Sequence, residues 1–261
     1  MTELSVEQIR RFRLAAHHLD RVYANADIPA VVGACGMQNS PPGAWETALF
    51  NRVPGCSRAE MERLLYEEKV LLQAWSMRGV PVVELVRKYL HCYGPATPDL
   101  FVTWLGCSKK QGRRLWELAA QEMEPVSVLG KRAFILAADR DGFGSPGELS
   151  REVLLLGGHD PFLDQRDRFI LQPDKSLHKQ IWKLVSNPGA IVYRGEIIGV
   201  WTGKKSGNKG MEIKMTLWME RGQDMRRELE RLGAEYAAFR GIACSSIIFQ
   251  VISKSDAQPH C

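Results

Sequence analysis

This sequence contains no CxxC pair, although it has six cysteines. A structural zinc site needs closely spaced ligands, and a disulfide framework is typical of small secreted domains, so neither is expected here. The cysteines are expected to be small buried apolar residues in a reducing cytoplasm. Cys35, beside a glycine, is interpreted as a packing residue rather than as a nucleophile.

Long hydrophobic runs are also missing. No stretch approaches the about 18 apolar residues of a membrane-spanning helix, and the amino terminus "MTELSVEQIRRFR" has no apolar signal core. Hydrophobic residues make up 45% of the 261 residues and charged residues 25%, which is enough apolar material for a well-buried core. The sequence therefore predicts a soluble, cytoplasmic globular protein without membrane contact.

The common catalytic signatures are absent too. The chain contains no GxxxxGK[ST] loop, no HExxH and no GxSxG, and no GxGxxG follows a strand. No cofactor and no metal is therefore expected. The stretch 159–168, "HDPFLDQRDR", carries His159, Asp160, Asp164 and Asp167, but Arg166 and Arg168 favour local salt bridges over a metal or acid/base site. A small-molecule enzyme built on this stretch remains a third alternative.

The clearest module is a series of three helices followed by two strands. Residues 82–93 have helical spacing and end before Gly94-Pro95, and Thr97 and Ser108 are expected N-caps of the next two helices. The segment "PVSVLGKRAFILAA" then alternates as two strands around a turn at 129–131. This order is that of a winged helix-turn-helix, which we place at residues 82–146.

The third of these helices is strongly basic. Lys109, Lys110, Arg113 and Arg114 are spaced by four and project on one side, while Leu115, Trp116 and Leu118 are expected to face inward. Such a cluster neutralises DNA phosphates and releases their counterions. A solvated basic face is the alternative. The net charge of +5 permits nucleic-acid binding without requiring it.

Other elements complete the expected organisation. A helix is expected over 5–22, with a capping box at Ser5 and Gln8 and with His17 and His18 as a half-buried or solvated pair. Ser57 and Glu60 suggest a second capping box. Residues 139–149 are the best linker candidate, and 224–241 form a helix with one apolar stripe. We expect an amino-terminal unit at 1–81 and an α+β carboxy-terminal domain at 147–261.

Two hairpins are expected in the carboxy-terminal domain. The first turns at Arg194-Gly195, and the second has a flexible tip within 203–210. The second hairpin carries lysines that are candidates for contact with a nucleic-acid groove, and a solvated loop is the alternative. These lysines are Lys204, Lys205, Lys209 and Lys214.

Residues 38–40 are uncharged and polar. They follow a segment rich in glycine and cysteine and precede Pro41-Pro42-Gly43, after which a helix-like run begins. Several segments, in this order, resemble the winged-helix DNA glycosylases that unhook interstrand crosslinks and release bulky alkylated purines, the AlkZ/YcaQ type. The segments are "GMQNSPPGAWETALFNRV", "WSMRGVPV", "YGPATPDLFVTWLG", "HDPFLDQRDR" and "NPGAIVYRGEIIGVWTGKK".

The resemblance implies an α+β fold of tandem winged helix-turn-helix units around a DNA-sized channel, followed by a β-rich carboxy-terminal domain. It implies double-stranded DNA, alkylated or crosslinked, as the partner, and we favour a monomer. The family's Gln-x-Gln signature falls on Gln38 and Ser40, so only its first glutamine is present. The family pattern is shortened at Met77–Pro81, so the resemblance implies DNA binding more strongly than a closed channel or full crosslink unhooking.

An amide is chemically sufficient for this reaction on an N7-alkylated purine, because the base is already cationic and leaves readily. A glutamine carbonyl can position water or stabilise the developing positive charge on the sugar, although it is no general base. We therefore expect Gln38 to be central, with Asn39, Ser40 and Trp45 nearby. The alternative function is a non-catalytic winged-helix DNA-binding protein or transcriptional regulator.

Overall fold

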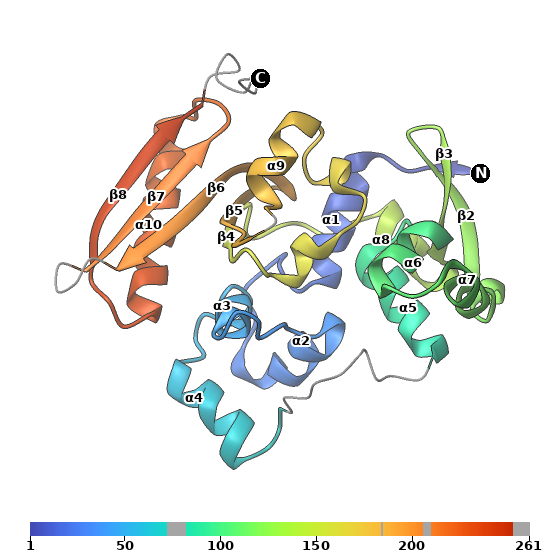
Figure 1. Cartoon of the computed structure of the whole chain (residues 1–261), viewed down its shortest axis with the longest axis horizontal. Helices are drawn as coiled ribbons and strands as arrows, with labels where there is room; N and C mark the ends of the chain where they lie inside the picture. Colours follow the sequence, from blue (N-terminus) through green and yellow to red (C-terminus); the bar gives the residue numbers. More distant parts are fainter. Residues whose placement is uncertain (72–81, 184, 206–209, 253–261) are drawn as a thin grey trace.

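The computed structural model describes residues 1–71, 82–183, 185–205 and 210–252, and it confirms the α+β class (Figure 1). Two sheets lie toward opposite ends of the molecule, with helices between them. The α-helices are α1 (Val6–Ala16), α2 (Ile28–Cys35), α3 (Ala44–Phe50), α4 (Arg58–Glu62), α5 (Val82–Tyr93), α6 (Pro98–Leu105), α7 (Lys109–Glu117), α8 (Arg140–Gly144), α9 (His178–Ile181) and α10 (Gln223–Phe239).

Shorter turns connect these helices. They are η1 (Asn25–Asp27), the π-helical η2 (Arg63–Glu67), η3 (Ala120–Glu122), η4 (Ala137–Asp139), η5 (Pro161–Asp164), η6 (Arg168–Ile170) and η7 (Lys175–Leu177). None of the helices within the described ranges combines the length and the apolarity that a bilayer crossing requires.

Helices α5, α6 and α7 are followed by a hairpin, in the order that the sequence predicts. The strands are β2 (Met123–Val128) and β3 (Lys131–Leu136), and β1 (Thr2–Glu3) joins β2 in parallel. The Thr97 and Ser108 side chains cap α6 and α7 as expected. The hairpin turns at Leu129 and Gly130, both with positive φ, which suits the right-handed twist of the strands.

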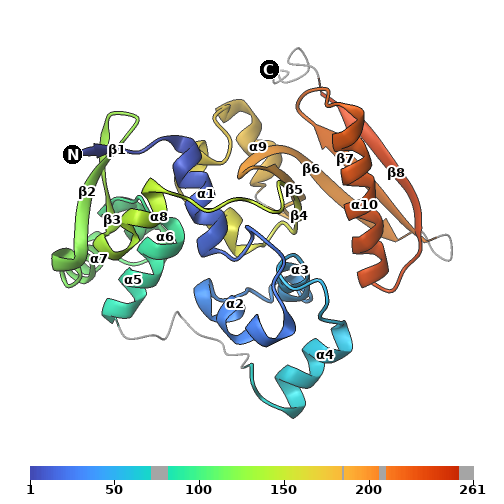
Figure 2. The same cartoon turned by 180° about the vertical axis from the view of Figure 1, so that it is seen from behind.

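The second sheet has the strand order β4-β5-β6-β7-β8. Its strands are β4 (Val153–Leu156), β5 (Gly189–Tyr193), β6 (Glu196–Lys205), β7 (Met211–Leu217) and β8 (Cys244–Val251). Helix α10 connects the parallel strands β7 and β8 and covers one face of the sheet (Figure 2). The expected stripe packs there, with Leu229 and Leu232 buried against Met215 and Trp201. The β5–β6 turn lies at Arg194-Gly195, as predicted.

Helix α1 packs against several parts of the chain through a buried arginine. The Arg13 guanidinium is fully buried and pairs with Asp167 at 2.7 Å, and it also donates to the main-chain oxygens of Tyr93 and Gly94. A desolvated charge is tolerated when it is paired and its donors are satisfied. These contacts bring together the three segments proposed from the sequence. The division at 81 and 146 stays a prediction, and its first boundary falls outside the described residues.

Several local expectations need correction. The first helix ends at Ala16 rather than at 22, because His18 adopts a positive φ of 55°. His17 is fully buried, not half-buried, and its Nε2 lies 3.1 Å from the Cys92 carbonyl oxygen. Leu118, expected to face inward, is 56% exposed because the chain leaves α7 there.

The expected linker at 139–149 is partly helical. It includes α8, whose Phe143 is buried and stacks on Phe12 with ring centroids 3.8 Å apart. An apolar ring inside a glycine-rich stretch therefore anchors it to α1. The capping box at Ser5 and Gln8 is confirmed, whereas at Ser57 the hydroxyl accepts from the Glu60 N–H without the return bond expected of a box. The predicted shortening at 77–81 and the tip with Lys209 lie outside the described residues.

Candidate active-site cleft

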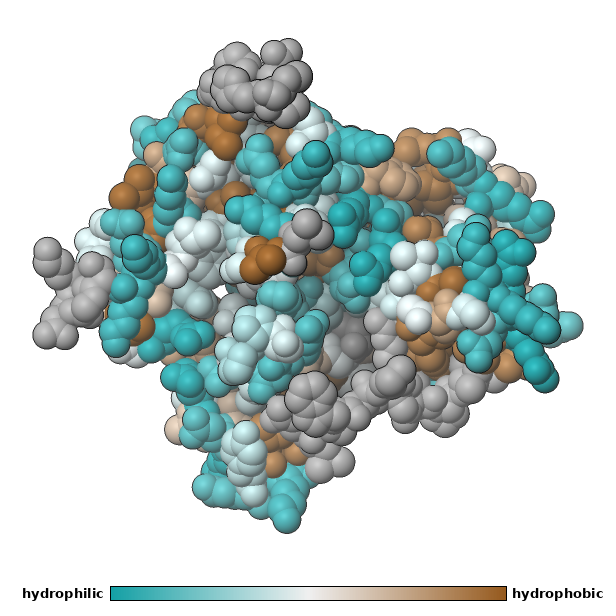
Figure 3. All heavy atoms as spheres, viewed as in Figure 1, coloured by the Kyte–Doolittle hydropathy of each residue, from teal (hydrophilic) through white to brown (hydrophobic). Residues whose placement is uncertain are grey.

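Gln38 and Ser40 line a cleft of about 620 Å³ between α3, the carboxy-terminal sheet and α10. The space-filling view is hollowed between that sheet and the centre of the molecule (Figure 3). Four further segments line the cleft: residues 157–159 after β4, residues 186–189 before and at the start of β5, residues 201–203 of β6, and Tyr236 of α10 with Arg240, the residue after that helix. Residues distant in sequence thus meet around the predicted motif.

The loop that presents Gln38 is held in place by the side chain of Asn39, the next residue. The Asn39 Oδ1 accepts a hydrogen bond at 2.8 Å from the Gly43 N–H, and Gly43 has a φ of +84° immediately before α3. Gln38 and Ser40, on either side, are exposed. Asn39 is not among the residues that line the cleft, and its predicted part in the chemistry stays a prediction. Trp45 is half-buried against the core of α2, α3 and α4.

His159 is a cleft residue that sequence reasoning assigned to a different cluster. Its half-buried side chain lines the same cleft as Gln38, and among the described residues it has no hydrogen-bond partner. Its neighbour Asp160 points into the core and pairs with Arg52 at 2.8 Å. The glycines before it, Gly157 and Gly158, were the only signal in the sequence that this stretch forms a close turn.

The acidic residues of the 159–168 stretch all form ion pairs with arginines. Asp164 pairs with Arg166 at 3.1 Å, which confirms one local salt bridge, but Asp160 and Asp167 pair with Arg52 and Arg13 from distant segments. Arg168 instead lies over the Trp182 ring, 4.7 Å from its centroid. Within the described part of the chain, no three His, Cys, Asp or Glu side chains gather as metal ligands do.

The charge of the cleft wall is positive. Arg240 is the one arginine or lysine among the described residues that line it, and no carboxylate is found in that set. Lys204 and Lys205 follow the lining residue Gly203 on β6, and both are exposed. The described lining residues therefore favour a phosphate backbone and include no carboxylate base.

The basic helix lies elsewhere. Lys109, Lys110, Arg113 and Arg114 are all exposed on α7, and hydrophilic side chains gather over that end of the molecule (Figure 3). Arg113 is held weakly by Asp99 at 3.4 Å, with both side chains more than half exposed. Helix α7 contributes no lining residue to the cleft. The two basic groups predicted from the sequence are therefore separate surfaces.

Comparison with known proteins places this arrangement in a family. A sequence profile described as "DNA glycosylase AlkZ-like" matches residues 31–83 and 80–239. The chain belongs to the AlkZ-like family of DNA glycosylases, which confirms the resemblance found in its motifs. The two matched ranges meet where the sequence suggested an internal shortening, and that shortening stays a prediction.

A curated sequence and a solved structure, both from Streptomyces sahachiroi, are similar to this chain. The "Interstrand DNA cross-link repair glycosylase" is 29% identical over 124 residues, covering 45% of this chain and 33% of that protein. The aligned segment thus spans about a third of that curated relative. The solved structure of "DNA glycosylase AlkZ" has a TM-score of 0.70 at 16% identity, covering 96% of this chain and 100% of that chain, and it supports the fold.

Proposed function

We propose that this protein is a DNA glycosylase that hydrolyses the N-glycosidic bond of N7-alkylated purines. The observation that carries the proposal is the cleft itself: Gln38, Ser40 and His159 open into a positively charged space without a carboxylate among its described lining residues. The family relationship and the name of the similar crosslink-repair glycosylase support this proposal.

The chemistry fits this set of residues. An N7-alkylated purine carries a positive charge, so it leaves without protonation, and the reaction requires a placed water and stabilisation of a cationic sugar. Because Gln38 is exposed and has no hydrogen-bond partner among the described residues, its amide oxygen is free to accept from that water. The Ser40 hydroxyl lines the same cleft and supplies a second, shorter hydrogen-bonding group.

His159 adds the one imidazole among the described lining residues. An imidazole nitrogen can accept the proton that water loses when it attacks the sugar, which an amide cannot do. In this proposal Gln38 orients the water and His159 takes its proton.

DNA contact is assigned to two surfaces. Arg240, Lys204 and Lys205 lie in or next to the cleft and would hold the phosphates that flank the target nucleotide. Helix α7 would bind the duplex farther along as the recognition helix of a winged helix-turn-helix. The tandem arrangement of two such units is part of this proposal.

The test uses a duplex that contains one N7-methylguanine. Wild-type protein is expected to release the free base faster than buffer does, and Gln38→Ala and His159→Ala each lower the single-turnover rate by about 100-fold or more. Gln121→Ala, an exposed glutamine outside the cleft, is the matched control and keeps the full rate. Duplex affinity, measured by fluorescence anisotropy, is expected to stay within about threefold for all three variants.

A DNA-binding protein without catalysis is the second candidate, and the exposed basic face of α7 favours it. Retained duplex binding with no base release above buffer by the wild type would select this second function. Retained release in Gln38→Ala would instead keep the activity and reject Gln38 as its centre.

A further inference from the structure

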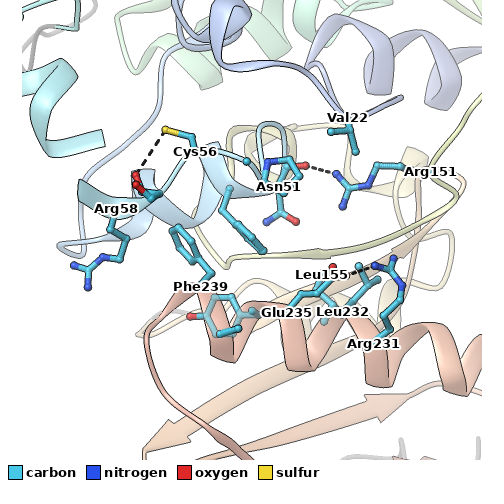
Figure 4. A pocket seen from close by; sticks show the side chains of 16 residues that line it. Val22, Asn51, Cys56, Arg58, Arg151, Leu155, Arg231, Leu232, Glu235 and Phe239 are labelled. Carbon is cyan, nitrogen blue, oxygen red and sulfur yellow. Dashed lines mark hydrogen bonds and ion pairs between the residues drawn. The ribbon is translucent and has the colours of Figure 1, made fainter. Parts of the chain in front are cut away.

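A second cavity, of about 650 Å³, lies between α10 and the turn that follows α3 (Figure 4). Its lining comes from residues 50–51 and 54–58, from Val22, from Arg151 and Leu155 near β4, and from α10. It shares Tyr236 with the cleft but contains none of Gln38, Ser40 and His159. The function proposed above does not use it.

Among the described residues that line this cavity, Arg151 is the arginine that forms no ion pair. Figure 4 shows its guanidinium donating to the main-chain oxygen of Asn51, and no ion pair between described residues involves it. Burial lowers the pKa of Arg151, and the nearby Arg231 adds to that direction while Glu235 opposes it. A desolvated cation with spare donors is stabilised by an anion.

The other charged side chains at the cavity are already paired. Arg58 contacts Glu46 at 2.8 Å, and Arg231 contacts Glu228 at 2.7 Å and also Glu235. Glu235 is the only carboxylate in the described lining, against three arginines. An anion is therefore better accommodated than a cation.

The rest of the wall is apolar and aromatic. Phe50 and Phe239 stack with their ring centroids 4.3 Å apart, and Leu155 and Leu232 are buried beside them. Figure 4 shows Val22 next to Arg151 and Phe239 on the α10 side. A ring placed here gains dispersion and apolar burial while its charged group reaches Arg151.

We propose that this cavity binds a small aromatic anion of about the size of a mononucleotide, with its phosphate or carboxylate on Arg151 and its ring against Phe50, Leu155 and Phe239. The volume is within the roughly 300–1,000 Å³ range of small-molecule sites. Because the two walls come from α3 and α10, which also line the cleft, a bound ligand would hold these helices together.

The test is ligand-observed NMR and isothermal titration calorimetry with four probes: deoxyadenosine 5′-monophosphate, indole-3-acetate, adenosine and inorganic phosphate. At least one of the two aromatic anions is expected to bind about tenfold or more tightly than adenosine and phosphate. The comparison between the two anions tells a phosphate ligand from a carboxylate ligand.

Substitutions inside and outside the cavity show where the ligand binds. Val22→Trp, at a position 55% exposed, should fill the mouth and abolish binding without affecting the fold, whereas Val70→Trp, at 49% exposure outside the cavity, is the matched control. Arg151→Gln should weaken binding about tenfold, with thermal unfolding as a check on the fold. Gln38→Ala should bind the aromatic anion as the wild type does. The binding test therefore gives its answer whether or not the protein releases bases.

Two results would overturn the proposal. One is that neither aromatic anion binds more tightly than adenosine and phosphate. The other is that binding survives in Val22→Trp or is lost in Gln38→Ala, which would place the ligand in the cleft.

Discussion

Arg52 and Asp160 form an ion pair that is closed to solvent and that joins the end of α3 to the residue beside His159. Two contacts connect the guanidinium and the carboxylate, at 2.8 and 3.0 Å. Arg52 also donates to the main-chain oxygens of His17 and Ala48, both at 2.7 Å. The pair therefore sets the position of His159 relative to the helix that follows the Gln38 loop.

Removing one partner of this pair should be costly. Arg52→Met leaves the Asp160 carboxylate buried and uncompensated, so the free energy of unfolding should fall by about 3–5 kcal/mol. Urea denaturation followed by circular dichroism measures this change. The double variant Arg52→Met/Asp160→Leu should recover part of the loss. If the single variant lost less than about 1 kcal/mol, the pair would not stabilise the fold.

A substitution at Ser40 tests whether the missing second glutamine of the family signature limits the rate of base release. Because Ser40 is exposed at the cleft, a longer side chain fits there, and Ser40→Gln should raise the single-turnover rate of base release by about tenfold, or 1.4 kcal/mol of barrier. Ser186→Gln places the same amide elsewhere in the cleft and serves as the control. Equal rates for Ser40→Gln and wild type would mean that the second glutamine is not used in this chain.

The basic face of α7 should govern salt dependence. Lys110→Ala/Arg114→Ala removes two phosphate contacts, so the slope of log affinity against log salt should flatten by about one to two units. Anisotropy titrations of a duplex at several salt concentrations give this slope. Lys179→Ala/Lys183→Ala, on and after α9, changes the net charge equally and is the control. A slope that does not change in the α7 variant would place α7 outside the DNA interface.

The Cys56 thiol should make the protein less stable at alkaline pH. Burial, with a smaller contribution from Glu60, raises the pKa of Cys56 from 9.0 to about 11. The unfolded chain therefore ionises first, and the free energy of unfolding should fall as pH rises from about 9 to about 11. Urea midpoints at pH 8 and pH 10.5 measure the fall, which should be smaller in Cys56→Ala. An identical fall in that variant would assign the effect to other groups, such as Tyr23.

Local signals in the sequence were sufficient for much of the fold. At Ser5, Thr97 and Ser108 the capping hydroxyl accepts a hydrogen bond from the backbone N–H three residues later, so spacing alone identifies these caps. The pairing of β5 with β6 was predictable for a similar reason, because the turn residues that join the two strands lie between them in the sequence. Helix ends without such a signal, as at Ala16, were misplaced.

Long-range pairing was not predictable in the same way. Arg13 and Asp167 are 154 residues apart, and Arg52 and Asp160 are 108 apart, so the nearest arginines in sequence looked like the partners. The same limitation applied to the cleft. Gln38 and Ser40 were marked by composition and resemblance, but only the folded chain brings His159, Tyr236 and Arg240 beside them.

The parallel pairing of β1 with β2 has a consequence for biosynthesis. Thr2 and Glu3 pair with Val126 and Ser127, and Leu4 and Ile9 are buried in the same cluster as Val126 and Ile135. Residues 2–9 are synthesised before residues 123–136, so their apolar side chains stay uncovered until the later segment has been made. During translation this exposed apolar segment is a natural place for a chaperone to bind, because its partners in the sheet and core lie more than 100 residues later.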